Sequence, residues 1–234
     1  MRISIFPLPG ALLFPGLQLP LHIFEPRYRQ LVKECLASGS VFGVNLVEKS
    51  HLYPVGCTAR IVSVTQEYED GRMDIIVEGV ERYTLEGIQE GDKPFFVANV
   101  DPLPDEEEPL DTALVAKCAS LYNEIVDIVY GAAGPHFDPA AFHGITPSFL
   151  LAPKSGLNAD QKQHMLELTS ENSRLEMLYD HLTEIVPTIR QAEVVQKIIR
   201  ARRRSAAPTA PPEAGRGHAA AQGCEAGAVG GAAS

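Results

Sequence analysis

The stretch ISIFPLPGALLFPGLQLPLHIF, from Ile3 to Phe24, carries no charged residue in 22 positions and is followed at once by the polar sequence EPRYRQ. Hydropathy alone would allow a membrane helix here, because about 20 apolar residues span the hydrocarbon core of a bilayer. Its four prolines argue against a helix, since each removes a backbone donor and an interior proline costs about 3 kcal/mol. We therefore predict two short apolar strands, folded back on each other and buried in the core of a soluble protein.

The turn between these strands is predicted at Pro15-Gly16. Proline presets the first central position of a type II turn, and glycine accepts the positive φ of the second. Apolar side chains around this turn are expected to fill the core, and they are Phe14, Leu17, Leu19, Leu21 and Ile23.

Composition limits the classes of function. The 234 residues are 45% hydrophobic and carry a formal net charge of -10, which disfavours non-specific binding to nucleic acid or to anionic membranes. The four cysteines are widely spaced without a CxxC pair, a pattern typical of reduced thiols in a cytoplasm. Pro7 and Pro9 interrupt any helical signal-peptide region. We expect a cytoplasmic protein with no membrane partner.

Beyond the uncharged run the pattern is one helix and then mostly strands. Glu25-Pro26 predicts a helix start and Gly39 its stop, with an apolar face formed by Tyr28, Leu31, Val32, Cys35 and Leu36. Strands are predicted over 41–47, 55–88 and 94–100, with a tight hairpin turn at Asp70-Gly71 and a bulge at Gly79. Several short strands and one early helix favour a small, partly closed β-barrel.

The acidic, proline-rich segment 101–111 separates this part from a helical second half. A solvated linker is the leading interpretation, and a hard-cation site in its carboxylates is the alternative. A helix is predicted from about 112 to Gly131, lined by Leu114, Val115, Cys118, Leu121, Tyr122, Ile125, Val126 and Val129.

Further along, Asn158 and Gln161 predict a capping box, and Ser170 opens another helix. Pro187 is expected to kink or end that helix. The Ala-, Gly- and Pro-rich residues from 205 onward are predicted to be disordered.

Signatures of common enzymes are missing from the sequence. It has no GxxxxGK[ST] phosphate loop, no GxSxG and no HExxH. His136, His143 and Asp138 share a loop, where ordinary loop polarity is favoured over a weak metal cluster. The arginines at 200 and 202–204 are interpreted as a solvated helix end, with an RNA or anionic-lipid contact as the alternative. We expect no catalytic residue, cofactor or metal.

The exact sequence of the uncharged run resembles that of a known family. FPLPGALLFPGLQLPLHIFEPRYRQLV, from Phe6 to Val32, resembles the start of the Lon protease N-terminal substrate-binding domain, in which LFPG is followed by LPLHIFEPRYR. The match continues through FGV at 42–44, GCTARIVSV at 56–64 and DGRMDIIVEGVERYTL at 70–85. These segments cover most of residues 5 to 100, and the helical half resembles the bundle that follows the barrel in that family.

This resemblance implies an α+β fold, with a PUA-like small β-barrel and one early helix over 1–104 and a C-terminal helical bundle over 105–204. The tail predicted from its composition to be disordered completes the division, over 205–234. It also implies a stand-alone short form without ATPase or protease modules. The expected function is non-catalytic binding of unfolded or tagged polypeptides, with an adaptor role in protein quality control beside a protease or chaperone. RNA binding is the alternative, because PUA-like barrels serve that role in other families. An unrecognised hydrolase using the loop of His136 and His143 is a third.

The segment HIFEPRYR has two interpretations. In the structural one, its apolar residues fill the core and Glu25 pairs with Arg27 or Arg29 near the helix start, contributing about 0–1 kcal/mol. In the functional one, His22, Glu25, Arg27 and Tyr28 border a peptide-binding surface at which an extended peptide adds to a sheet.

Overall fold

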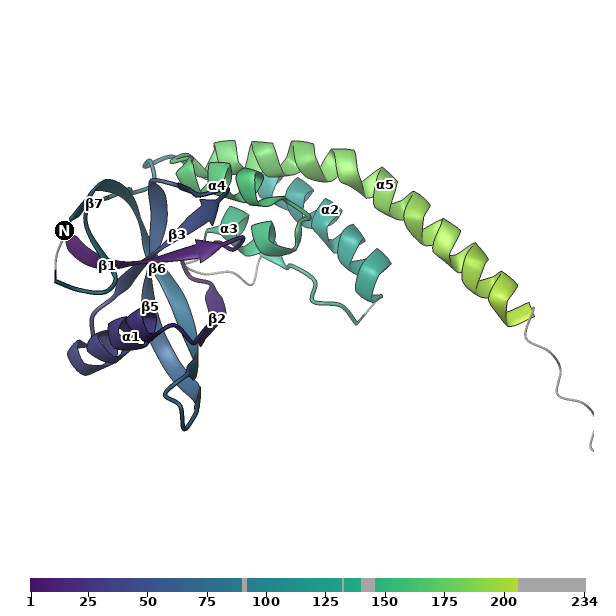
Figure 1. Cartoon of the computed structure of the whole chain (residues 1–234). Coiled ribbons are helices and arrows are strands. Elements are labelled where there is room, and N and C mark those ends of the chain that lie inside the picture. The colour runs from purple at the N-terminus through teal and green to yellow at the C-terminus, as the bar shows by residue number, and fades with distance from the viewer. Residues whose placement is uncertain (90–91, 132, 140–145, 206–234) are drawn as a thin grey trace, which may run out of the picture. The chain divides into compact units, whose positions relative to one another are not determined.

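The computed structural model describes residues 1–89, 92–131, 133–139 and 146–205. The chain divides into two compact units, Met1–Val194 and Val195–Ser234. The secondary-structure elements (Figure 1) are β1 Arg2–Pro9, β2 Gln18–Ile23, α1 Pro26–Ser38, β3 Phe42–Glu48, β4 His51–Leu52, β5 Val55–Glu67, β6 Met73–Gln89, β7 Phe96–Pro102, α2 Thr112–Tyr130, α3 Pro147–Leu151, the 3-10 helix η2 Ala152–Lys154, α4 Ala159–Glu167 and α5 Glu171–Ser205.

A seven-stranded, mostly antiparallel sheet forms the N-terminal half, so the fold is α+β. Its strand order is β1-β7-β6-β5-β3-β4, and β2 pairs with β6 off this path. Strand β1 also pairs with β3, in parallel, from Ile5 opposite Gly43 to Pro9 opposite Val47. The pairings β1–β7, β7–β6, β6–β5, β5–β3 and β3–β1 therefore make a closed circuit.

The uncharged run supplies both predicted strands, β1 and β2. The prediction that they fold back on each other is wrong, because β1 pairs with β3 and β7 while β2 pairs with β6. The physical reason lies in the turn between them. The N–H of Gly16 donates to the carbonyl of Gly79 on β6 at 2.8 Å, and the N–H of Gly79 donates to the carbonyl of Leu17 at 2.9 Å. The turn is thereby held on β6, and each flanking strand finds a different partner.

The turn itself has the predicted geometry. Gly16 has a φ of +76°, and the N–H of Leu17 donates to the carbonyl of Phe14 at 3.2 Å across Pro15. The predicted irregularity at Gly79 is also confirmed, because the β5–β6 register shifts between the pairs Cys57–Arg82 and Ala59–Gly79.

Helix α1 covers one hydrophobic core of the sheet. It begins after Glu25 with proline in its first turn and ends at Gly39, whose φ is +65°, as predicted. Leu31 and Val32 are fully buried against strand residues. Leu36 is 45% exposed, so its predicted place in the apolar face is wrong. A helix turns 100° per residue, and position 36 has passed beyond the buried stripe.

A second core joins helices α2 to α5, and two residues from the sheet half enter it. Phe14 stacks on Phe149 of α3 with ring centroids 5.1 Å apart. Val129 in the last turn of α2 is 57% exposed and the following Tyr130 is 61% exposed, so the buried stripe ends at Val126, before the helix does, contrary to the prediction. The capping box of Asn158 and Gln161 is confirmed at the start of α4.

Helix α5 begins after Ser170, as predicted, with the N–H of Ser173 donating to Ser170 Oγ at 3.0 Å. It then runs through Pro187 to Ser205, so of the two outcomes predicted at this proline, a kink or an end of the helix, the end is wrong. Proline removes one backbone donor, and the packing of the neighbouring Val186, which is 3% exposed, holds the helix through that position.

The acidic segment 101–111 is tied down rather than merely solvated. Both guanidinium nitrogens Nη1 and Nη2 of Arg174 donate to Asp105 at 2.8 Å, and Arg82 contacts the same carboxylate. Glu108 accepts from the N–H of Asn172 at 3.0 Å and from Ser170 Oγ at 2.8 Å. The prediction of a solvated linker did not include these contacts with buried arginines.

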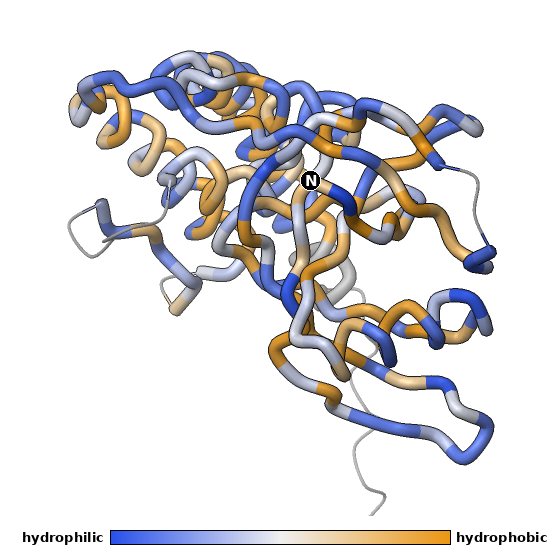
Figure 2. Tube along the Cα trace, turned by 90° about the vertical axis from the view of Figure 1, so that its left-hand side faces the viewer, coloured by the Kyte–Doolittle hydropathy of each residue, from blue (hydrophilic) through white to orange (hydrophobic). Residues whose placement is uncertain are grey.

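Three of the four cysteines, Cys35, Cys57 and Cys118, are buried and unpaired. None of the helices within the described residues is both long and apolar enough to span a membrane. The residues of the predicted disordered tail beyond 205 lie outside the described part of the chain. Figure 2 shows that the tip of the β5–β6 hairpin is hydrophilic, in keeping with its sequence around Asp70.

Candidate functional site: an apolar cavity beside the start of α1

Residues from β1, α1, β3, β4, β6 and β7 enclose a cavity of about 400 Å³. We call it the apolar cavity, because hydrophobic side chains make up most of its lining. It is lined by Pro7, Pro9, Glu25, Arg27, Tyr28, Val47, Ser50, Leu52, Ile88 and Phe96.

Strand pairing positions one wall. Pro9 on β1 lies opposite Val47 on β3 in the parallel ladder, and Leu52 on β4 lies opposite Val47 on its other side. The two-residue turn between β3 and β4 holds Lys49 at a φ of 48° and Ser50 at 65°. Positive φ at both central residues is the conformation that a tight antiparallel hairpin favours. This turn folds β4 back so that Leu52 and Ser50 face the cavity.

Two exposed hydrophobic residues form the opposite wall. Ile88 on β6 is 48% exposed and Phe96 on β7 is 43% exposed. Both residues were expected in strands, and neither was among the predicted site residues. The Phe95-Phe96 doublet could have indicated that one of the two rings is exposed, because successive side chains of a strand point to opposite faces. Phe95 is 5% exposed, so Phe96 must point outward.

The start of α1, with its N-cap residue Glu25, contributes three residues of the predicted peptide-binding surface. Arg27 Nε lies 2.8 Å from Glu25 Oε2, and the Arg27 guanidinium carbon lies 4.5 Å from the centroid of the Tyr28 ring. Tyr28 is 5% exposed, and its ring centroid is 4.4 Å from that of Phe6. Burial raises the pKa of Tyr28, and the positive charge of Arg27 offsets part of this rise. The Tyr28 phenol is therefore a neutral wall of the cavity at physiological pH.

His22, the fourth predicted residue, lies outside the lining of this cavity. Its Nδ1 is 2.5 Å from Asp74 Oδ1, and its ring neighbours those of Phe24 and Tyr68, with centroids 6.0 Å and 5.9 Å away. Hydrogen bonds from His22 and Tyr68 lower the pKa of Asp74. His22 thus belongs to a separate exposed aromatic cluster on β2 and the β5–β6 hairpin.

The remaining candidate groups lie elsewhere. His136 Nε2 is 2.9 Å from Asp127 Oδ1, while His143 and the side chains of the arginines at 200–204 are outside the described residues. In the part of the chain that the structure describes, no group of three or more His, Cys, Asp or Glu could hold a metal ion. The apolar cavity combines apolar walls, the aromatic rings of Tyr28 and Phe96 and the ion pair of Glu25 with Arg27, a combination that is common in clefts that bind organic ligands.

Comparison with known proteins identifies the fold. The family model for the ATP-dependent protease La (LON) substrate-binding domain matches residues 2–184. The crystal structure of a Lon N-terminal domain protein from Xanthomonas campestris aligns with a TM-score of 0.60 and 26% identity, covering 76% of this chain and 96% of that one. The N-terminal domain of Lon protease from the Mycobacterium avium complex aligns with a TM-score of 0.57 at 18% identity, covering 78% and 98%.

Similar curated proteins are Lon proteases. That of Anaeromyxobacter dehalogenans (strain 2CP-C) is 25% identical over 194 residues, which are 77% of this chain and 23% of the relative. That of Parabacteroides distasonis is 31% identical over 131 residues, 51% of this chain and 16% of the relative. The chain thus spans about a quarter or less of the length of the curated relatives that it matches.

Proposed function

The chain belongs to the ATP-dependent protease La (LON) substrate-binding domain family, and from that premise we propose that it binds unfolded or tagged polypeptides in the apolar cavity beside the start of α1. Glu25, Arg27 and Tyr28 form part of the binding surface in this proposal. The polypeptide is bound without being cleaved, because the matched family is a substrate-binding domain.

The observation that carries the proposal is the exposure of Ile88 and Phe96 at the cavity wall. Clefts that bind organic ligands have volumes of about 300–1,000 Å³ and mostly apolar linings, and about 400 Å³ falls in that range. Aromatic residues such as Phe96 are enriched at binding interfaces because they bury a large area with few rotatable bonds. A bulky apolar side chain of an unfolded polypeptide is the ligand group that fits this site.

The test measures binding of a fluorescently labelled, chemically unfolded model polypeptide by anisotropy. We expect the double variant Ile88→Ser/Phe96→Ser to bind about tenfold or more weakly, since loss of an aromatic or aliphatic anchor costs at least about 1 kcal/mol. Both residues are already exposed, so the fold is retained, which circular dichroism checks.

Phe24→Ser is the matched control, because Phe24 is 59% exposed and stacks on His22 outside the cavity. Equal loss of binding in this control and in the double variant would reject the apolar cavity as the site. It would instead favour the surface around His22, whose role stays a prediction.

The finer parts of the functional hypothesis are proposals as well. We propose that the chain acts as an adaptor that passes bound polypeptides to a protease or chaperone. Crosslinking in the native host followed by mass spectrometry tests this role. Recovery of polypeptide clients with no protease or chaperone would contradict the adaptor role while leaving binding intact.

We also propose the predicted division into a PUA-like barrel over 1–104 and a helical bundle over 105–204. The closed circuit of strand pairings supports the first part, and the hydrophobic core that joins helices α2 to α5 supports the second. RNA binding, the alternative, has less support, because the net charge of -10 repels a polyanion. A mobility-shift assay in low salt tests it.

A further inference from the structure

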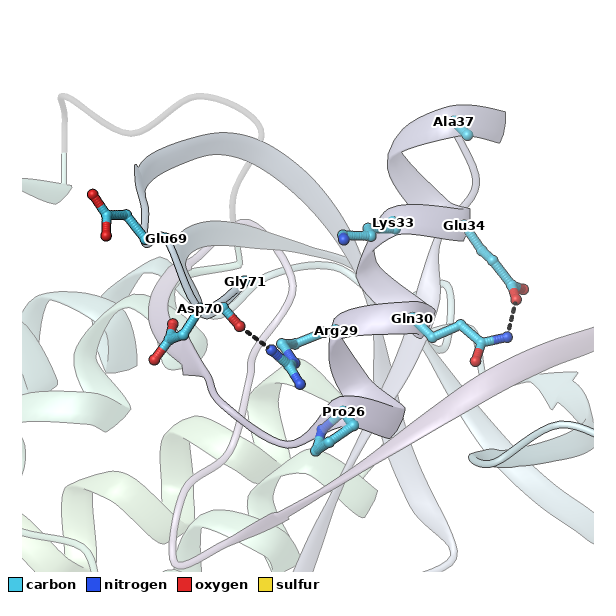
Figure 3. A pocket seen from close by; sticks show the side chains of 9 residues that line it. All are labelled: Pro26, Arg29, Gln30, Lys33, Glu34, Ala37, Glu69, Asp70 and Gly71. Carbon is cyan, nitrogen blue, oxygen red and sulfur yellow. Dashed lines mark hydrogen bonds between the residues drawn. The ribbon is translucent and has the colours of Figure 1, made fainter.

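A second cavity, of about 650 Å³, lies between α1 and the tip of the β5–β6 hairpin. We call it the α1–hairpin groove. Figure 3 shows side chains of α1 along one side and the hairpin residues Glu69, Asp70 and Gly71 along the other. None of the predicted site residues lines it.

Two cations of α1 face this groove. Arg29 and Lys33 are four residues apart, so they lie on the same face of the helix. Arg29 Nη1 donates to the backbone carbonyl of Asp70 at 2.5 Å. Gly71 has a φ of 83°, a backbone conformation that glycine adopts readily, and it forms the tight hairpin turn beside this carbonyl. The hairpin tip thereby fixes the position of the guanidinium group.

Most of the hydrogen-bonding capacity of this pair is unused. A guanidinium has five N–H donors and an ammonium has three. Within the described residues, the side chain of Arg29 makes a single hydrogen bond and the side chain of Lys33 makes none. An anionic partner would therefore bind to Arg29 and Lys33 without breaking an existing ion pair.

The neighbouring carboxylates do not occupy these cations. The carboxylate of Asp70 accepts from Arg72, from Nε at 2.6 Å and from the backbone N–H at 3.1 Å. Glu34 pairs with Lys93 and accepts from Gln30 at 3.0 Å. Figure 3 shows the carboxylates of Glu69 and Asp70 turned away from α1.

We propose that the α1–hairpin groove binds the carboxylate of an acidic side chain in an extended polypeptide, through Arg29 and Lys33. The inference rests on the proposed polypeptide binding and names the class of polypeptide. Three acidic residues border the groove, but Asp70 pairs with Arg72 and Glu34 pairs with Lys93. The two cations therefore outweigh the charge of Glu69 beside them. The net charge of -10 disfavours polyanions, so a single carboxylate suits the site. Arginine holds a carboxylate by paired N–H donors, and lysine adds a point charge.

The first turn of α1 separates the two cavities. Arg27 and Tyr28 line the apolar cavity, while Pro26 and Arg29 line the groove. A helix is about 10–12 Å across, and an extended chain advances about 3.3 Å per residue. A polypeptide that fills both cavities thus carries a bulky apolar residue and an acidic residue about three or four positions apart.

The experiment uses three labelled, Gly/Ser-rich peptides with amidated C-termini. Each contains a phenylalanine and, four residues later, Glu, Gln or Lys. By anisotropy in low salt, we expect the Glu peptide to bind the wild-type protein about three- to fivefold more tightly than the Gln peptide. High salt abolishes this difference, because it screens exposed charges. Lys33→Glu reverses the preference toward the Lys peptide.

Lys154→Glu is the matched control for net charge, since Lys154 is an exposed lysine of η2 outside the groove. It should keep the preference for the Glu peptide. Equal binding of the Glu and Gln peptides to the wild type, with loss of both in Ile88→Ser/Phe96→Ser, would overturn this inference and leave the proposed function standing. Binding of none of the three peptides would overturn both.

Discussion

At the scale of single residues, Gly79 decides how the uncharged run meets the sheet. It exchanges two hydrogen bonds with the turn at Pro15-Gly16, and a Cβ built on it would lie 2.2 Å from the carbonyl oxygen of Phe14. No real Cβ approaches backbone that closely, so only glycine permits this contact. The turn in turn delivers Phe14 to the helical core. The close approach that Gly79 permits therefore links the sheet to the core of the helices.

We expect Gly79→Ala to lower the free energy of unfolding by about 1–3 kcal/mol, because overpacking against backbone forces a local shift. Gly87→Ala is the control on the same strand, since a Cβ at Gly87 meets nothing within 4 Å. Its effect should stay within about 0.5 kcal/mol. Urea unfolding of the two variants compares them directly, and equal stability would contradict the assigned role of Gly79.

At the scale of elements, a buried network joins β6, the acidic segment and the helices. Arg174 is fully buried and Arg82 is 4% exposed. Both contact Asp105, and their guanidinium carbons lie 4.5 Å and 5.6 Å from the centroid of the Phe149 ring. Arg82 also donates to the carbonyls of Leu166 and Leu168 that end α4, at 2.7 Å and 2.6 Å. This network fixes the acidic segment against the helices.

Asp105→Asn removes the carboxylate shared by the two buried guanidinium groups. We expect a loss at the lower end of the about 3–5 kcal/mol typical of a broken buried ion pair, because the Asp105 side chain itself is 37% exposed. Glu107→Gln, on the same segment, removes an equal charge and should change stability by less than about 0.5 kcal/mol. Thermal or urea unfolding measures both, and similar losses would contradict the network.

Glu108, in the same acidic segment, makes the stability of the folded protein depend on pH. Hydrogen bonds from the backbone of Asn172 and from the Ser170 hydroxyl lower the pKa of Glu108 below its ordinary value of 4.5. A lowered folded-state pKa adds stability above pH 4.5, and this contribution is lost as the pH falls through the folded value.

Glu108→Gln should therefore unfold at a lower temperature than wild type at pH 7, and the difference should shrink as the pH falls below 4.5. Glu107→Gln again serves as the control. Melting temperatures measured between pH 7 and pH 3 test this expectation. A difference that stays constant over that range would show that Glu108 acts through its shape rather than its charge.

Local patterns predicted the elements better than their partners. Gly16, Gly39 and the Asn158 capping box act within a few residues, so the sequence reveals them. The pairing of β2 with β6 depends on a contact 60 residues away at Gly79, which no local pattern encodes. Likewise the continuation of α5 through Pro187 depends on tertiary packing. The predicted burial of Leu36 and Val129, near the ends of their helices, was wrong for the same reason, because burial there depends on tertiary packing.

In the candidate site, too, local features were predictable from the sequence and long-range contacts were not. Glu25, Arg27 and Tyr28 were predicted because they lie within one contiguous motif. Their partners in the apolar cavity come from β1, β3, β4, β6 and β7, and only strand pairing brings them together. His22 was placed with them by adjacency in sequence. Side chains on successive strand positions alternate faces, and its partner Asp74 lies on another strand.

At the scale of the whole molecule, the sheet and α1 enclose one core and the helices enclose another. The apolar cavity opens beside the first turn of α1, at the edge of the sheet core, where Tyr28 belongs to that core and also lines the cavity. A rigid core therefore supports the cavity wall, while Ile88 and Phe96 remain exposed for contact. Preorganised apolar walls bind a ligand with little loss of conformational entropy.

The most direct test of polypeptide binding in the apolar cavity is an NMR titration of the labelled protein with a chemically unfolded polypeptide. If polypeptides bind in this cavity, the largest shifts of backbone amide resonances occur at Tyr28, Leu52, Ile88 and Phe96, and they vanish in Ile88→Ser/Phe96→Ser. Shifts centred instead on His22 and Phe24, or on the helical core, would contradict binding in this cavity. So would a spectrum that does not change at saturating polypeptide.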